Sequence, residues 1–121
     1  ATMKFVLGLD MDGVITRHPD HLRWLADRLL MSGHEVHIIT GRMERERTRT
    51  LKELKALRFR FTELHMYPGE YEYKGEALSV DDMDGVGEWK AGICADIGAN
   101  ILLEDNNHFY RADFEIPQVH I

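Results

Sequence analysis

The sequence of 121 residues predicts a single α/β domain over residues 1–121, with a mainly parallel sheet of five strands between two layers of helices. The first observation is that short apolar, β-rich segments alternate with segments of helical periodicity, as a parallel sheet requires. The second is that this length suffices for one compact core but not for two. No internal repeat, low-complexity tract or linker divides the chain, so we expect one domain.

The first half of the chain alternates strand and helix. Residues 4–9 (KFVLGL) form a short apolar segment that stops at an acidic residue, which is typical of a buried strand. Helical spacing then follows as far as Gly33, with apolar positions at Leu22, Leu25, Ala26, Leu29 and Leu30. Residues 36–39 predict a second strand. A charged helix is expected from about Glu44, with an inner face formed by Leu51, Leu54 and Leu57.

The second half repeats the alternation less clearly. Residues 63–67 predict a third strand that Pro68 and Gly69 end. Residues 70–87 have no readable pattern, because they combine scattered glycines with several acids. A helix is expected around residues 89–97, ending near Gly98, then a strand over 101–103 and a last strand over 116–121.

Composition excludes several classes of protein. No apolar run approaches the roughly 20 residues of a membrane span, and we expect neither a signal peptide nor a membrane partner. The single cysteine, Cys94, cannot form an internal disulfide, so a reducing cytoplasm is the expected location. Helical spacing from Ile93 to Ile97 favours a buried Cys94 over a reactive one.

Charge is distributed unevenly along the chain. The net charge is −6, yet residues 42–60 hold eight basic and three acidic residues, a local charge of +5. One interpretation is a solvated helix face with paired charges, which is the usual behaviour of such runs. The other is a basic surface that attracts a polyanionic substrate toward a nearby site. The sequence leaves both open.

Polar residues that could act in catalysis or ligand binding follow the predicted strands. Asp10 to Gly13 (DMDG) follows the first strand, residues 40–42 (TGR) the second, and residues 104–106 (EDN) the fourth. Lys90 is expected in the first turn of the helix that leads to the fourth strand. In open α/β sheets, ligands bind at the carboxyl ends of the strands, so these residues are expected to share one site.

The residue types in this cluster suit phosphate chemistry. Several carboxylates at one edge repel each other unless a cation lies among them, and oxygen ligands without cysteine or histidine suit Mg²⁺. Thr40, the backbone N–H of Gly41 and Lys90 can bind a phosphate. Asp10 can attack phosphorus as a nucleophile. Asp12 can protonate the leaving oxygen and later deprotonate the attacking water.

Four segments in order resemble the motifs of the haloacid dehalogenase superfamily of phosphotransferases, over nearly the whole chain. They are LGLDMDGVIT, HIITGR, EWKAGI and ILLEDN. The resemblance implies a Rossmann-like fold, an aspartyl-phosphate on Asp10, acid–base work by Asp12, and phosphate binding by Thr40 and Lys90. It also implies a Mg²⁺ site formed by Asp10, the backbone carbonyl of Asp12, and Asp105. Glu104 occupies a position that varies in the family, and we expect it to reach the metal through water.

Several residues have competing interpretations. Lys74 is a rival of Lys90, but it lies in an irregular stretch, so we favour Lys90. Arg42 can contact the substrate or face solvent. A second DMDG at residues 82–85 follows no apolar strand and is expected to be a solvated loop or the approach to a helix. The seven histidines show no pair on a shared helix face with a third ligand, so no zinc site is expected.

Members of this superfamily often carry a cap domain, and this chain has no room for one. About seven residues separate Gly13 from the first helix, and about twenty separate Tyr67 from Lys90. An open site favours a large substrate such as a nucleotide or a nucleic-acid 3′-phosphate, and the segment from Trp89 to Asn106 resembles polynucleotide 3′-phosphatases and deoxynucleotidases. The alternatives are a sugar-phosphate phosphatase closed by oligomerisation and a non-catalytic metal-binding interaction domain.

Overall fold

The computed structural model describes residues 3–72, 78–106 and 117–121. Its sheet has five strands in the order β3-β2-β1-β4-β5, and every neighbouring pair is parallel. The strands are β1 (Val6–Leu9), β2 (Glu35–Met43), β3 (Glu63–Tyr67), β4 (Ile101–Glu104) and β5 (Gln118–His120). The predicted fold class is therefore confirmed. The expected last strand began at Ile116, which lies outside the described residues.

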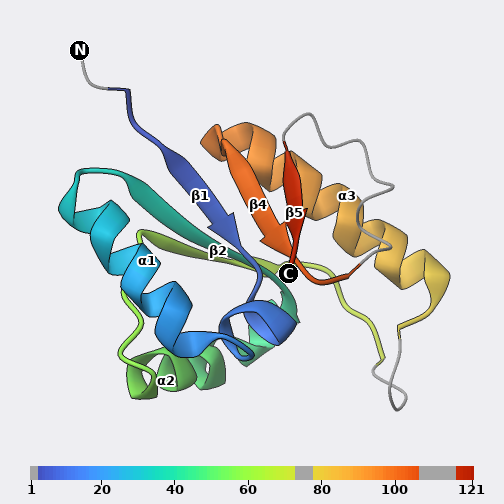
Figure 1. Ribbon diagram of the computed structural model, residues 1–121. Helices are drawn as coiled ribbons and strands as arrows, with labels where there is room; N and C mark the ends of the chain where they lie inside the picture. The colour runs from blue at the N-terminus through green and yellow to red at the C-terminus, as the bar shows by residue number, and fades with distance from the viewer. Residues whose placement is uncertain (1–2, 73–77, 107–116) are drawn as a thin grey trace.

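Helices cover the sheet from both sides (Figure 1). On one face, α1 (Pro19–Met31) and α2 (Arg47–Ala56) pack with inward residues of β1, β2 and β3, such as Leu9, Ile38 and Leu64. On the other face, α3 (Val80–Ile97) packs through Cys94 against Val6, Ile39 and Leu102. Successive strand residues face opposite layers, so each central strand contributes to both cores.

The inner face of α2 differs from the expected one. Thr50 and Leu54 are buried, whereas Leu51 is 41% exposed. Helix α2 begins at Arg47, after a short 3-10 turn, η2 (Glu44–Glu46), and its buried residues Thr50 and Leu54 are four positions apart, on one helix face. The prediction of Leu51 as an inner residue was therefore wrong.

Helix α3 begins about nine residues earlier than the sequence suggested. Ser79 is its N-cap, and the Ser79 hydroxyl accepts a hydrogen bond from the backbone N–H of Asp82 (3.1 Å). The second DMDG therefore lies inside the first turns of α3, and Lys90 lies near the middle of the helix, not in its first turn. The glycines at 85 and 87 obscured the start of this helix in the sequence, because Gly has a low helix propensity.

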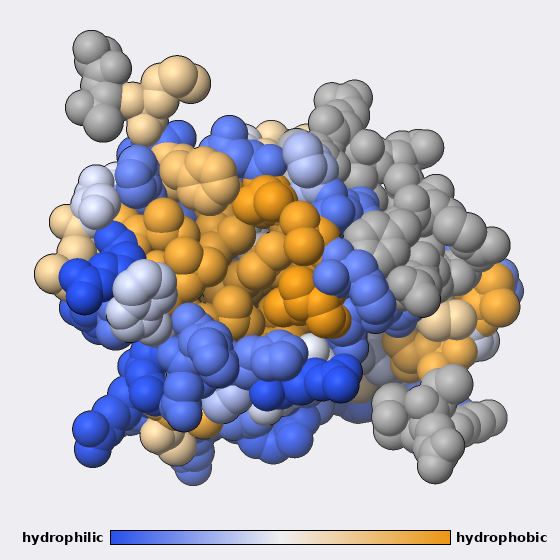
Figure 2. Space-filling view, viewed as in Figure 1, coloured by the Kyte–Doolittle hydropathy of each residue, from blue (hydrophilic) through white to orange (hydrophobic). Residues whose placement is uncertain are grey.

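Part of the sheet face beside α1 is not covered by a described helix. Figure 2 shows apolar side chains gathered there, between α1 and the C-terminal strand. Ile101, Leu103 and Ile121 pack only partly into the core on this side, and Val119 is 39% exposed. Within the described residues, none of the helices has the length and apolar character needed to cross a bilayer.

The cap at Ser79 is testable by mutation. Ser79→Ala removes the oxygen that accepts from the Asp82 N–H, so the free energy of unfolding should fall by about 1 kcal/mol. Urea unfolding followed by circular dichroism measures it. Ser32→Ala is the control, because the cap of α1 at Ser32 uses its backbone N–H. Equal stability of the two variants would contradict the assignment of the helix start.

Candidate active site

The predicted site residues meet at the carboxyl edge of the sheet, around the end of β1. The next strand along the chain, β2, lies on one side of β1, and β4 lies on the other, so the strand order reverses at this point. Such a switch point opens a crevice in α/β sheets. Here it forms a cavity of about 650 Å³ lined by Asp10, Asp12, Gly13, Thr40, Gly41, Arg42, Tyr71, Leu78, Val86, Lys90, Asp105 and Asn106.

The centre of the site is a buried ammonium between two carboxylates. Lys90 Nζ lies 3.1 Å from Asp10 Oδ1 and 2.6 Å from Glu104 Oε2, and the Lys90 side chain has no exposed surface. Asp10 is held again by the backbone N–H of Met11, which donates to Oδ1 (2.8 Å). The turn that follows β1, helix α3 and strand β4 are therefore joined by one cation.

Burial and neighbouring charge shift these groups in different directions. Burial raises the pKa of Asp10 well above its usual range, and the Glu104 charge adds to this, although Lys90 opposes both. Burial also raises the pKa of Asp105, with a further contribution from Glu104. For Lys90, burial favours the neutral amine, but Asp10 and Glu104 outweigh it and raise the pKa above its ordinary value. One ammonium does not balance the three carboxylates.

This charge imbalance identifies a group that could hold a cation. One oxygen each from Asp10, Glu104 and Asp105 lie within 4.8 Å of one another. Glu104 is already engaged by Lys90 at Oε2 and, at Oε1, by the backbone N–H groups of Asp105 (3.1 Å) and Asn106 (3.2 Å). An all-oxygen donor set of this kind suits a hard divalent cation such as Mg²⁺.

Asp12 is oriented by an arginine rather than by the lysine. Arg42 donates from Nε to Asp12 Oδ2 (2.9 Å) and from Nη2 to Oδ1 (2.7 Å), a two-point contact that fixes the plane of the carboxylate. Its remaining Nη1 donates to Thr50 and Glu53. Arg42 is 8% exposed, so it does not face solvent. Its expected role in substrate binding stays a prediction.

Thr40 and Gly41 lie in an irregular end of β2, not after it. The register with β3 shifts between Thr40 and Met43, and such bulges redirect side chains beside active sites. The Thr40 hydroxyl accepts from the Arg42 N–H (3.1 Å), which leaves its own hydrogen available to donate. Gly41 is needed for packing, because a Cβ there would lie 2.9 Å from Val86 Cγ1.

Two further groups were not apparent from the sequence. Tyr71 lies in the unreadable stretch after β3, and its hydroxyl donates to the carbonyl of Gly41 (2.7 Å) at the cavity wall. His37, Glu63 and His65 come together from neighbouring strands, which spacing along a single helix cannot reveal.

Two further residues that the sequence singled out are Lys74 and Cys94. Lys74, the rival of Lys90, lies outside the described residues. Cys94 is buried, and burial raises the pKa of its thiol to about 11, as an unreactive core residue requires.

Gly13 can test how closely the DMDG turn approaches β4. Its φ is +78°, and a Cβ there would lie 1.9 Å from Asp105 Oδ2. Gly13→Ala should lower the free energy of unfolding by about 1–2 kcal/mol through backbone strain alone. Gly92→Ala, in α3 with open space around it, should be neutral or stabilising. Chemical denaturation compares them, and a Gly13→Ala protein as stable as the native one would contradict this geometry.

Comparisons with known proteins show the fold. No family model and no curated protein matches the chain. A chain in the structure of the Pnkp1/Rnl/Hen1 RNA repair complex is similar, with a TM-score of 0.70 and 17% sequence identity. The match covers 98% of this chain but only 42% of that one, so this chain spans less than half of its structural relative. The protein thus shares the α/β architecture of one part of an RNA repair complex component.

Proposed function

We propose that this protein is a Mg²⁺-dependent phosphomonoester hydrolase of the haloacid dehalogenase type. One observation carries the proposal: a single cavity is lined by Asp10, Asp12, Thr40, Lys90 and Asp105, which come from four separate segments of the chain. A nucleophile, an acid–base group, phosphate donors and a metal ligand are the parts that this chemistry needs.

Asp10 is the proposed nucleophile. A carboxylate oxygen of Asp10 attacks phosphorus, and the bond to the leaving alcohol breaks as Asp12 donates a proton to its oxygen. Asp12 then takes a proton from the water that attacks the aspartyl-phosphate, and inorganic phosphate and free Asp10 result. Arg42 holds Asp12 in place for both steps through its two-point contact.

Lys90 and Thr40 bind the phosphate oxygens in this proposal. Both side chains are buried where the cavity meets the sheet, so their donors act with little competition from water. Glu104 holds the Lys90 ammonium at the position from which it also contacts Asp10. The positive charge is therefore fixed before substrate arrives, which is what electrostatic stabilisation of a transition state requires.

Mg²⁺ is the proposed cofactor, and Asp10, Asp105 and the backbone carbonyl of Asp12 would hold it, with Glu104 acting through water. The engagement of both Glu104 oxygens supports its indirect role. When bound, the ion would neutralise charge on the phosphate and on the carboxylates. It would also favour the ionised, nucleophilic form of Asp10, whose pKa burial raises.

The proposed substrate is a phosphate at a nucleic-acid or nucleotide 3′ end. A second cavity of about 450 Å³ shares Asp12, Arg42 and Tyr71 with the first, and Arg45 and Arg49 also line it. Both arginines are more than 60% exposed, and each has an exposed or half-exposed carboxylate beside it, Glu70 for Arg45 and Glu46 for Arg49, which a phosphate would have to displace. Part of the basic segment thus borders the site, where it can bind the backbone phosphates of a chain. The likeness to an RNA repair complex component supports the same substrate class.

The role of Asp10 can be tested by comparison with Asp82, the matching residue of the second DMDG segment. Asp10→Asn should lower turnover of p-nitrophenyl phosphate by several orders of magnitude, because no other carboxylate can take its position. Asp82→Asn changes the same letter of the second DMDG, which lies in α3 outside the cavity, and should retain activity. Turnover by the native protein and by the Asp82→Asn variant should require Mg²⁺ and stop with EDTA.

Two outcomes would contradict the proposal. Activity that survives in Asp10→Asn would exclude Asp10 as nucleophile. A correctly folded native protein without activity on any phosphomonoester would favour the non-catalytic, metal-binding domain instead.

The substrate class can be tested through the exposed arginines. The double variant Arg45→Gln, Arg49→Gln should lower kcat/KM on a 3′-phosphorylated oligonucleotide about tenfold. The slope of log(kcat/KM) against the logarithm of salt concentration should also become shallower, by about 0.7 for each backbone phosphate that is no longer bound. Turnover of p-nitrophenyl phosphate should not change. Lys52→Gln with Lys55→Gln removes the same charge from α2 away from both cavities and should affect neither substrate.

Initial rates on a panel of oligonucleotides, mononucleotides and sugar phosphates decide between the enzyme alternatives. A preference for sugar phosphates by orders of magnitude would overturn the nucleic-acid substrate. It would leave the chemistry of Asp10 intact and favour a site closed by a neighbouring copy.

A further inference from the structure

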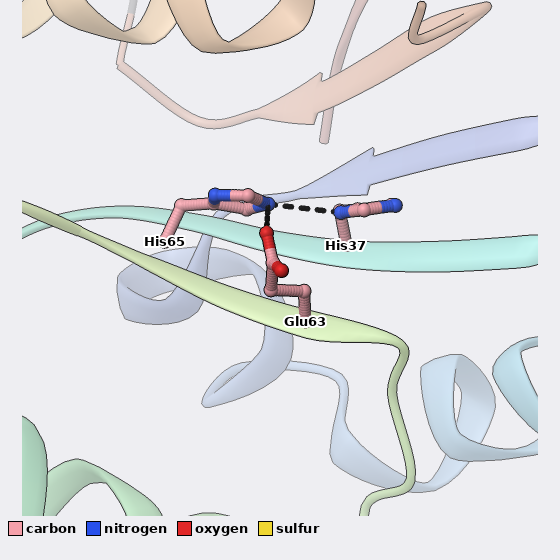
Figure 3. Close-up of side chains that lie close together, drawn as sticks. All are labelled: His37, Glu63 and His65. Atoms are coloured by element: carbon pink, nitrogen blue, oxygen red, sulfur yellow. Dashed lines mark hydrogen bonds and ion pairs between the residues drawn. The ribbon is translucent and has the colours of Figure 1, made fainter. Parts of the chain in front are cut away.

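Three metal-ligating side chains lie together away from the candidate active site. His37 in β2 and Glu63 and His65 in β3 point toward one another (Figure 3), and one donor atom from each lies within 4.8 Å of the others. His37 pairs with Glu63 in the parallel register, and His65 follows two residues later, so all three project from the α3 face of the sheet. Glu63 lies at the start of β3, whereas the candidate active site lies at the carboxyl ends of the strands.

The two contacts within this cluster cannot both be hydrogen bonds at the same time, because they share one nitrogen atom of His65. His37 Nδ1 lies 2.9 Å from His65 Nε2, and the same His65 nitrogen lies 3.1 Å from Glu63 Oε1. If His65 Nε2 carries a hydrogen, two acceptors compete for it. If His37 Nδ1 donates instead, the lone pair of His65 faces the Glu63 carboxylate. No protonation state gives each of the two contacts its own hydrogen without repulsion.

A metal ion would satisfy all three donors at once. Tetrahedral coordination at about 2.0–2.2 Å requires ligand atoms roughly 3.3 Å apart. The observed separations of 2.9 and 3.1 Å are only a few tenths of an ångström shorter, so small side-chain rotations would admit the ion. His37 is 5% exposed, so one of the two imidazoles is largely shielded from water.

Glu35 supplies the outer partner that such sites need. Its Oε1 accepts from His37 Nε2 (2.8 Å), which leaves the Nδ1 lone pair directed at the cluster. A carboxylate behind a ligating histidine fixes its tautomer and orientation and raises its basicity. Glu63 and His65 also line a cavity of about 460 Å³, from which water can supply a fourth ligand. Arg47 lines the same cavity, but its guanidinium is paired with Glu44.

We propose that His37, His65 and Glu63 form a second metal site, specific for Zn²⁺ or a similar late first-row cation, which links the edge strand β3 to β2. Two imidazoles and one carboxylate favour such ions over Mg²⁺. The all-oxygen group of Asp10, Glu104 and Asp105 has the opposite preference. The two sites can therefore be loaded separately.

The test is a calorimetric titration of the full chain, first freed of metal, with Zn²⁺ in excess Mg²⁺. One Zn²⁺ should bind per chain with micromolar or tighter affinity, and the unfolding temperature should rise. Glu35→Gln, a change in an outer partner, should weaken binding roughly 10- to 100-fold. His65→Gln should weaken it further. His21→Gln, an exposed histidine of α1, and Asp10→Asn should bind Zn²⁺ as the native protein does.

A second measurement does not depend on whether the variants fold. In the native protein, Co²⁺ should give the intense visible absorption of a tetrahedral site, and Zn²⁺ should shift the ring ¹⁵N resonances of His37 Nδ1 and His65 Nε2. Unshifted resonances at saturating Zn²⁺ would overturn the proposal. So would Zn²⁺ binding that Asp10→Asn abolishes, because the ion would then occupy the acidic group.

Discussion

The position of Lys90 is the constraint on which the rest of the site depends. A fully buried ammonium is costly unless it is paired, and Lys90 is paired on two sides, with Asp10 and Glu104. These contacts fix the helix α3 against β1 and β4 at the carboxyl edge of the sheet. They also explain why two carboxylates can be buried side by side. Removing the cation would leave both without their main partner.

Arg42 plays a parallel part on the other side of the cavity. Its rigid guanidinium binds Asp12 at two points and reaches Thr50 and Glu53 in α2. The site therefore uses one cation for each aspartate of the DMDG turn. A lysine offers a compact charge that can also bind phosphate, whereas an arginine offers a planar fork that orients a carboxylate. The different partners support different tasks for Asp10 and Asp12.

Sequence patterns predicted the position of those site residues that lie where a strand ends. Apolar segments that stop at Asp10, Thr40 and Glu104 placed those residues at one edge, and the structure confirms that they meet there. Helix boundaries and contacts across strands could not be predicted in the same way. The glycines at 85 and 87 obscured the start of α3, and the apolar spacing of α2 did not reveal that the polar Thr50, rather than Leu51, lies on its inner face. Contacts across strands, such as His37 with His65, depend on register, which one sequence does not encode visibly.

The strand order also divides the site between an earlier and a later part of the chain. The central strand β1 comes first along the chain, β2 and β3 add to one side of it, and only then does the chain cross back to add β4 and β5. The first 67 residues contain three strands and the two helices of one layer, α1 and α2. Without β4, that edge of β1 would be unpaired and open to misassembly with another chain. In the folded chain, β4 pairs that edge and α3 brings Lys90 to Asp10, so the elements that complete the sheet also complete the cavity.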